Sequence, residues 1–177
     1  MSEKYLVAYA TRYGSTKEVA QAVAKTLGEF SPSVECKKLR EVKTLEDFDA
    51  AVIGAPLYIS RLHKDALRFL SRHRKSLTVL PTAVFALGPV RDPHDEQEWR
   101  ASRAQLDQEL SRFAWFKPVV IQLFGGKYDP QLLGFLLNKL AGDTPATDIR
   151  DWSAIDAWTR ALPDKFALHL SNSSRSG

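Results

Sequence analysis

Short apolar runs alternate along the chain with segments in which apolar residues recur every three or four positions. Five runs have the length and composition of strands, namely residues 4–10, 34–39, 49–55, 82–87 and 118–124. The run at 34–39 alternates weakly between apolar and polar residues, which is typical of a strand with one face in solvent. The other runs are almost continuously apolar, which indicates strands buried on both faces.

The segments between these runs have the periodicity of amphipathic helices. Val19, Val23 and Leu27 recur at four-residue steps, and Gly28 is placed to end that helix. Similar patterns predict helices over residues 65–75, 96–113, 129–141 and 151–162. Strands that alternate with helices predict a parallel sheet covered on both faces. Five strands fit the doubly wound order 2-1-3-4-5 better than an eight-stranded barrel, which needs about 250 residues.

The length of 177 residues fits one domain. We expect this domain to span residues 1–166 and the Ser-rich residues 167–177 to be a disordered tail. The chain has no signal-peptide pattern and no apolar run long enough to span a bilayer, so we expect a cytoplasmic protein. Cys36 is the only cysteine, and the four histidines have no metal-site spacing, so neither a disulfide within the chain nor a metal site is predicted.

The segment after the first strand has the properties of a phosphate-binding loop. In parallel sheets of this kind, ligands bind at the carboxyl ends of the strands. Residues 11–16 (TRYGST) open a helix there, and their hydroxyls and amides can surround a phosphate at the positive end of the helix dipole. Gly14 allows the backbone to approach a ligand closely. The alternative is that Ser and Thr simply cap the helix.

The pattern Thr-x-Tyr-Gly-Ser-Thr after an N-terminal strand resembles the phosphate loop of the flavodoxin family. The resemblance implies a flavodoxin-like three-layer α/β sandwich in which a five-stranded parallel sheet has helices on both faces. It also implies FMN as the cofactor, since this loop holds the 5′-phosphate of FMN in that family. The residues that correspond to the family's phosphate loop are Thr11, Arg12, Tyr13, Gly14, Ser15 and Thr16.

Two further strand ends resemble loops that border the flavin ring. Residues 54–61 (GAPLYISR) are similar to a loop in the branch of the family that includes menaquinone-dependent protoporphyrinogen dehydrogenase, although Ser60 stands where that branch usually has glycine. The cofactor contacts implied in this loop are Pro56, Leu57, Tyr58, Ile59 and Ser60. The third loop adds Leu87, Gly88, Pro89 and Val90. Tyr58 is expected to pack on the ring, and the amides of the third loop are expected to meet its pyrimidine side. The alternative for the second loop is an ordinary turn with a surface tyrosine.

The charge of the chain is +4, from 25 Lys and Arg against 21 Asp and Glu, and much of the excess is local. Residues 61–75 carry six positive charges and one negative charge, and five of the cations recur at three- or four-residue steps: Arg61, Lys64, Arg68, Arg72 and Lys75. One interpretation is a solvated helix face. The other is docking to an acidic protein or peripheral contact with an anionic membrane, at the inner face of the membrane. Nucleic acid is not expected, because no reader motif is present.

The resemblance implies a role in electron transfer or quinone-linked oxidoreduction, with a redox partner protein or a quinone as partner. Because the flavin carries the electrons, no catalytic side chain is predicted. A first alternative is menaquinone-dependent dehydrogenation of protoporphyrinogen IX in heme biosynthesis. Residues 125–130 weaken it, because the corresponding segment of that enzyme is longer and more basic. A second alternative is a non-enzymatic module that binds another phosphate ligand or a protein.

Overall fold

A parallel sheet forms the centre of the molecule in the computed structural model, which describes residues 3–58, 61–134, 139, 142 and 144–175. Its strands are β1 (Lys4–Tyr9), β2 (Ser33–Lys38), β3 (Ala50–Tyr58), β5 (Thr82–Leu87) and β6 (Val120–Phe124). They lie in the order β2-β1-β3-β5-β6, and every neighbouring pair is parallel. The order 2-1-3-4-5 predicted for the five strands is therefore confirmed.

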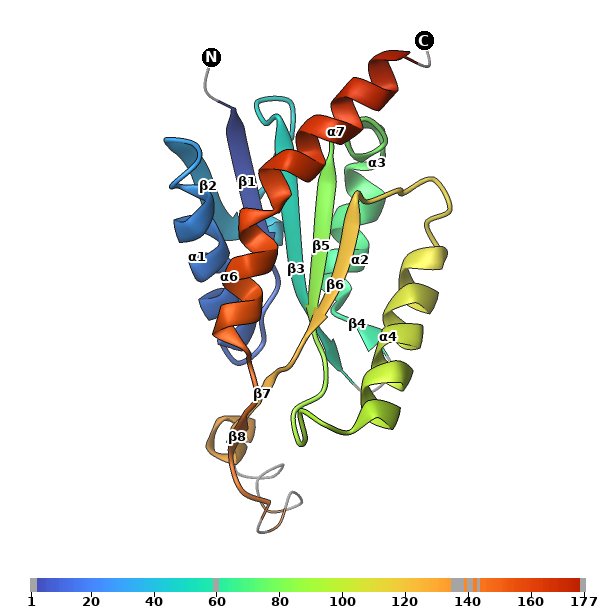
Figure 1. The fold of residues 1–177 in the computed structure, drawn as a ribbon. Coiled ribbons are helices and arrows are strands. Elements are labelled where there is room, and N and C mark those ends of the chain that lie inside the picture. The colour runs from blue at the N-terminus through green and yellow to red at the C-terminus, as the bar shows by residue number, and fades with distance from the viewer. Residues whose placement is uncertain (1–2, 59–60, 135–138, 140–141, 143, 176–177) are drawn as a thin grey trace.

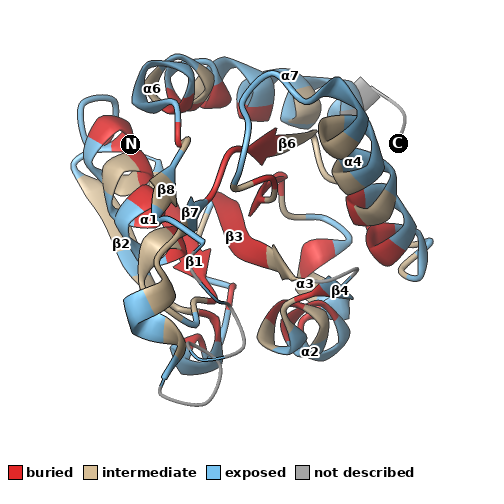
Figure 2. Cartoon of the chain, turned by 90° about the horizontal axis from the view of Figure 1, so that it is seen from below, coloured by how far each residue is buried: buried red, intermediate tan, exposed pale blue. Residues whose placement is uncertain are grey.

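Helices cover both faces of this sheet (Figures 1 and 2). One face carries α1 (Ser15–Leu27), α6 (Trp152–Arg160) and α7 (Leu162–Arg175), and the other carries α2 (Lys64–Arg72), α3 (Arg74–Leu77) and α4 (Glu96–Ser111). Successive residues of a strand point to opposite faces. In β1, Leu6 and Ala8 accordingly pack with α2 and α4, whereas Val7 packs with α1. This alternation explains why β1 is apolar along nearly its whole length.

The third strand is longer than predicted. Pro56, Leu57 and Tyr58, which were expected in a loop, are the last residues of β3. The short strand β4 (Arg61–Leu62) folds back and pairs with Leu57 and Tyr58 in antiparallel fashion, and this pairing continues the strand beyond its parallel partners. Ile59 and Ser60, the remaining predicted contacts of this loop, lie outside the described residues.

The predicted helix over 65–75 is divided in two. His73 adopts a non-helical conformation, ends α2 and precedes α3. His73 is buried and its ring packs on Phe69, with 4.5 Å between the ring centroids. Upstream, a short 3₁₀ helix, η1 (Leu39–Glu41), follows β2 and lies against α2.

The segment between β6 and α6 differs most from the prediction. It contains an antiparallel pair, β7 (Lys127–Tyr128) and β8 (Thr147–Asp148), which extends beyond the carboxyl end of the sheet (Figure 1). Where a helix was predicted over 129–141, the structure has a 3₁₀ helix, η2 (Pro130–Leu133), and residues 135–138 and 140–141 lie outside the described part.

The C-terminal residues also differ from the expected disordered tail. Helix α7 continues to Arg175, although disorder was predicted from residue 167. Leu162 and Phe166 anchor its first turns in the core, and the later turns extend into solvent, where Leu168 is 64% exposed. A helix anchored at one end can propagate at low cost once its first turn has formed. In the part of the chain that the structure describes, no helix is long and apolar enough to cross a membrane.

Candidate cofactor-binding site

The three segments predicted to bind the cofactor meet at one edge of the sheet. The strand register places Tyr9 opposite Gly54 and Pro56 opposite Leu87. The chain leaves β1, β3 and β5 at neighbouring points, at the lower end of the sheet in Figure 1. Residues 11–16, 56–58 and 87–90 therefore border the same region, as expected for the carboxyl ends of parallel strands.

Helix α1 begins without a side-chain cap. Gly14 is its N-cap residue, with a left-handed φ of 94° that favours glycine, and no described side chain caps the first turn by accepting from its amides. The Gly14 N–H donates instead to Thr11 Oγ1, at 2.9 Å. The amides of Ser15 and Thr16 have no acceptor among the described residues. No Ser or Thr side chain in the described part of the chain caps α1, which leaves the positive end of the helix available to an anion.

The hydroxyl of Thr16 strengthens this interpretation. Thr16 is fully buried in the first turn of α1, and its Oγ1 has no hydrogen-bond partner. A buried polar group without a partner costs about 1–3 kcal/mol. An anion seated on the first turn of α1 would supply the missing acceptor. The residues present therefore fit the phosphate of a cofactor.

A tyrosine of this loop contacts a tyrosine at the end of β3. The rings of Tyr13 and Tyr58 meet edge to face, with 6.3 Å between their centroids, and the Arg12 guanidinium lies 5.2 Å from the centroid of Tyr13. Burial, assisted by the nearby Tyr13, raises the pKa of Tyr58 to about 12. The phenol of Tyr58 is therefore neutral at physiological pH. The pair forms an apolar wall with polar tips, which suits the edge of a planar ring system.

The backbone of the third loop forms most of its hydrogen bonds with the last residue of β6 and the segment that follows. The Gly88 N–H donates to the Phe124 carbonyl at 2.9 Å, and the Gly126 N–H donates to the Pro89 carbonyl at 2.7 Å. The Thr147 hydroxyl donates to the Val90 carbonyl. The amides of this loop were expected to face a ring. The Gly88 N–H is already bonded and Pro89 has no N–H, so only the Val90 N–H remains available.

Arg150 is a residue of this region that the sequence did not reveal. Its side chain is only 3% exposed, and it bonds to Asp148 at 2.6 Å, to Glu18 at 2.6 Å and to the Ser15 carbonyl at 3.3 Å. The guanidinium lowers the pKa of the Asp148 carboxyl. Arg150 thus ties the segment after β6 to the first turn of α1. Since Ser15 and Arg150 are far apart in the chain, no local pattern could have indicated the contact.

The basic residues of 61–75 do not form one continuous helix face. The side chains of Lys64, Arg68 and Arg72 lie along α2, whereas Arg74 belongs to α3 and stacks over Trp115 at 5.6 Å from the ring centroid. The described residues contain no group of His, Cys, Asp and Glu side chains that could hold a metal ion.

Comparison with known proteins identifies the family. A family model for the flavodoxin domain matches residues 6–140. Protoporphyrinogen IX dehydrogenase (quinone) of Leishmania major is 22% identical over 170 residues, which cover 87% of this chain and 72% of that protein. The protein of the same name from Escherichia coli (strain K12) is 24% identical over 150 residues, covering 71% of this chain and 83% of that protein.

Solved structures show the same fold. Oxidised flavodoxin 1 from Bacillus cereus superposes with a TM-score of 0.56 at 18% identity, over 94% of this chain and 98% of that chain. The Flv1 flavodiiron core from Synechocystis sp. PCC6803 superposes with a TM-score of 0.59 at 13% identity, over 97% of this chain and 37% of that chain. At these identities the likeness concerns the fold alone.

Proposed function

This chain belongs to the flavodoxin domain family, whose members typically bind FMN, and we propose from this that it binds FMN and acts in electron transfer or quinone-linked oxidoreduction. The observation that carries the proposal is the start of α1. Its first amides are uncapped, and the buried Thr16 hydroxyl beside them has no partner. Uncapped amides and a buried donor at a helix N-terminus are the features that a phosphate monoester needs.

Each of the three segments has a proposed part in holding the cofactor. The amides of Ser15 and Thr16 and the hydroxyls of Thr11 and Thr16 donate to the phosphate. Thr11 can do so because its Oγ1 only accepts from Gly14, so its own proton is free. Tyr58 packs against the ring system, and Pro56, Leu57 and residues 87–90 border it.

When bound, FMN supplies one- and two-electron chemistry. The carboxyl edge of the sheet would hold the ring, with Tyr58 packed against it. We assign no acid, base or nucleophile to any side chain of the chain.

The curated relatives support quinone-linked oxidoreduction. Both are named protoporphyrinogen IX dehydrogenases that use quinone, and at 22% and 24% identity they support a quinone as electron acceptor. Dehydrogenation of protoporphyrinogen IX is accordingly the second candidate function. The membrane contact of residues 61–75 stays a prediction.

The first experiment is an FMN titration of the purified chain, with riboflavin as the matched control. FMN and riboflavin differ only in the phosphate, so a site built at the start of α1 should bind FMN at least about tenfold more tightly, which corresponds to about 1.4 kcal/mol. Flavin fluorescence and absorption report the binding. A folded protein that binds neither flavin would overturn the proposal. Equal binding of both flavins would show that the start of α1 does not bind the phosphate.

A second experiment separates the candidate activities. FMN-loaded protein is reduced chemically and mixed with a menaquinone analogue, and reoxidation of the flavin is followed by absorption. The same protein is then given protoporphyrinogen with the quinone, and porphyrin fluorescence is recorded. Reoxidation without porphyrin supports a quinone-linked function with another electron donor, whereas porphyrin formation supports the second candidate.

A further inference from the structure

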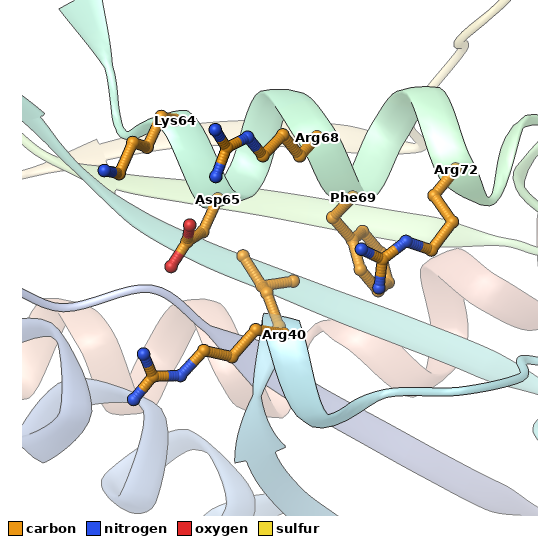
Figure 3. A pocket seen from close by; sticks show the side chains of 7 residues that line it. Arg40, Lys64, Asp65, Arg68, Phe69 and Arg72 are labelled. Carbon is orange, nitrogen blue, oxygen red and sulfur yellow. The ribbon is translucent and has the colours of Figure 1, made fainter.

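A hollow of about 290 Å³ lies between η1 and α2, outside the proposed FMN contacts (Figure 3). Its floor is apolar, since Leu39 and Phe69 are 1% and 2% exposed. Its rim is cationic: Arg40 comes from η1, and Lys64, Arg68 and Arg72 come from α2. Asp65 is the single acidic residue of the lining. The lining therefore carries four positive charges and one negative charge.

None of these four cations forms an ion pair with a described residue. Three helical cations elsewhere in the described chain pair with acids one turn away. On α4, Arg100 pairs with Glu96 and Arg103 with Asp107, and on α6, Arg160 pairs with Asp156. Lys17, Lys25 and Lys165 are also unpaired among the residues that the structure describes, so what distinguishes the rim is that four unpaired cations surround one hollow.

The unpaired arrangement has an energetic cost for α2. Lys64, Arg68 and Arg72 follow one another at steps of four residues, and like charges at this spacing destabilise a helix. Lys64 also stands at the N-terminus of the helix, where the helix dipole disfavours a cation. A bound anion would offset both effects, because it would lie between the cations and neutralise them.

We propose that this hollow binds a compact organic anion that carries two or more carboxylate or phosphate groups. The guanidinium groups of Arg40, Arg68 and Arg72 can form paired hydrogen bonds with such groups. The apolar floor would contact the carbon body of the ligand, and Asp65 would accept a hydrogen bond from a ligand hydroxyl. The volume lies at the small end of the range for small-molecule sites, about 300–1,000 Å³, so the ligand is smaller than a nucleotide.

The hollow favours a small ligand over a membrane surface. Its cations come from two elements, η1 and α2, with the hollow between them, whereas a flat lipid surface needs only an exposed row. The hollow also offers no apolar side chain for insertion into lipid. None of the large exposed apolar residues of the described chain lines it; these are Phe30, Val79, Leu132, Trp152, Leu168 and Leu170.

The test is isothermal titration of the flavin-free protein with citrate and, separately, with inorganic pyrophosphate, both at constant ionic strength. Citrate represents the carboxylates and pyrophosphate the phosphates, and the tighter of the two identifies the preferred group. Arg40→Gln and Arg68→Gln should each weaken binding about tenfold, which is the loss of one charge-assisted hydrogen bond. Lys75→Gln is the matched control: it removes the same charge from an exposed neighbour on α3 that does not line the hollow, and it should change affinity less than twofold.

Three results would overturn the proposal. The first is that neither anion binds. The second is that Lys75→Gln weakens binding as much as Arg40→Gln, which would indicate diffuse attraction to a basic surface. The third is that the protein sediments with vesicles of phosphatidylglycerol and phosphatidylcholine in equal parts, undisturbed by citrate, and that Arg68→Gln abolishes this sedimentation. That result would assign the cations to a membrane.

Discussion

Replacement of Thr16 by valine should move protein stability and cofactor affinity in opposite directions. The Thr16 side chain is fully buried and its hydroxyl has no partner, so the folded protein without cofactor bears the cost of that group. Valine has nearly the same shape without the polar atom. We therefore expect the free energy of unfolding of the flavin-free protein to stay unchanged or to rise by up to about 1–3 kcal/mol. FMN binding should weaken about 10- to 100-fold, because a hydrogen bond to a charged group contributes about 1.5–3 kcal/mol.

Urea denaturation of the flavin-free protein and titration with FMN measure the two effects separately. Thr159→Val is the matched control. Thr159 is also fully buried in a helix, but its hydroxyl donates to the Ile155 carbonyl at 2.7 Å. This variant should lose about 0.5–1.5 kcal/mol of stability and keep its affinity for FMN.

Two outcomes would refute the reasoning about Thr16. If Thr16→Val binds FMN as tightly as the unmodified protein, the phosphate does not contact this hydroxyl. If Thr16→Val destabilises the flavin-free protein as much as Thr159→Val does, the hydroxyl has a partner in the folded state and is not held ready for a ligand. Loss of affinity together with loss of folding would support neither claim, and circular dichroism identifies that case.

Three further predictions concern the stability of the fold that carries the site. Gly54→Ala should destabilise the fold by about 1–3 kcal/mol in urea, because the new Cβ would lie 2.1 Å from Cζ of the fully buried Phe85; a neutral effect would mean that the ring moves aside freely. Arg150→Gln should lower the free energy of unfolding by about 1–3 kcal/mol in the same assay, less than for a fully buried ion pair because the acidic partners of Arg150 are half-exposed. It should also weaken FMN binding, and unchanged affinity would show that Arg150 does not support the site. Burial lowers the pKa of His63 and His73, so the unfolded state binds more protons at acidic pH. The free energy of unfolding should therefore fall as the pH drops below about 6.5. The double variant His63→Asn and His73→Phe should show a smaller fall, and an equal fall would contradict this origin.

Much of the candidate site could be predicted from the sequence because it lies in local segments. Residues 11–16 follow a buried strand and precede a helix, and both elements are visible in the periodicity of the chain. Ser15 and Thr16 are among the phosphate ligands implied by the resemblance of this segment to the flavodoxin phosphate loop. The sequence left open whether they cap the helix, since Ser and Thr are suited to both roles. In the structure Gly14 is the N-cap residue and no side chain that the structure describes caps the first turn, which favours the phosphate role.

Other parts of the site depend on contacts between distant segments. The strand conformation of Pro56 depends on pairing with Leu87 of β5, which a local pattern containing proline argues against. The engagement of Gly88 depends on Phe124, and the burial of Arg150 depends on Glu18. In each case one partner is invisible until the chain is folded.

The sequence by itself determined the layers of this protein, because the face that a residue presents follows from its position in a strand or a helix. It also determined that the basic residues gather after the third strand. Only the tertiary structure decided which of them act together. Lys64, Arg68 and Arg72 gain Arg40 as a partner across a hollow, while Arg74 turns to Trp115. Periodicity specifies the direction in which a side chain points from its own helix or strand. The distance between two elements is set by the packing of all the elements together.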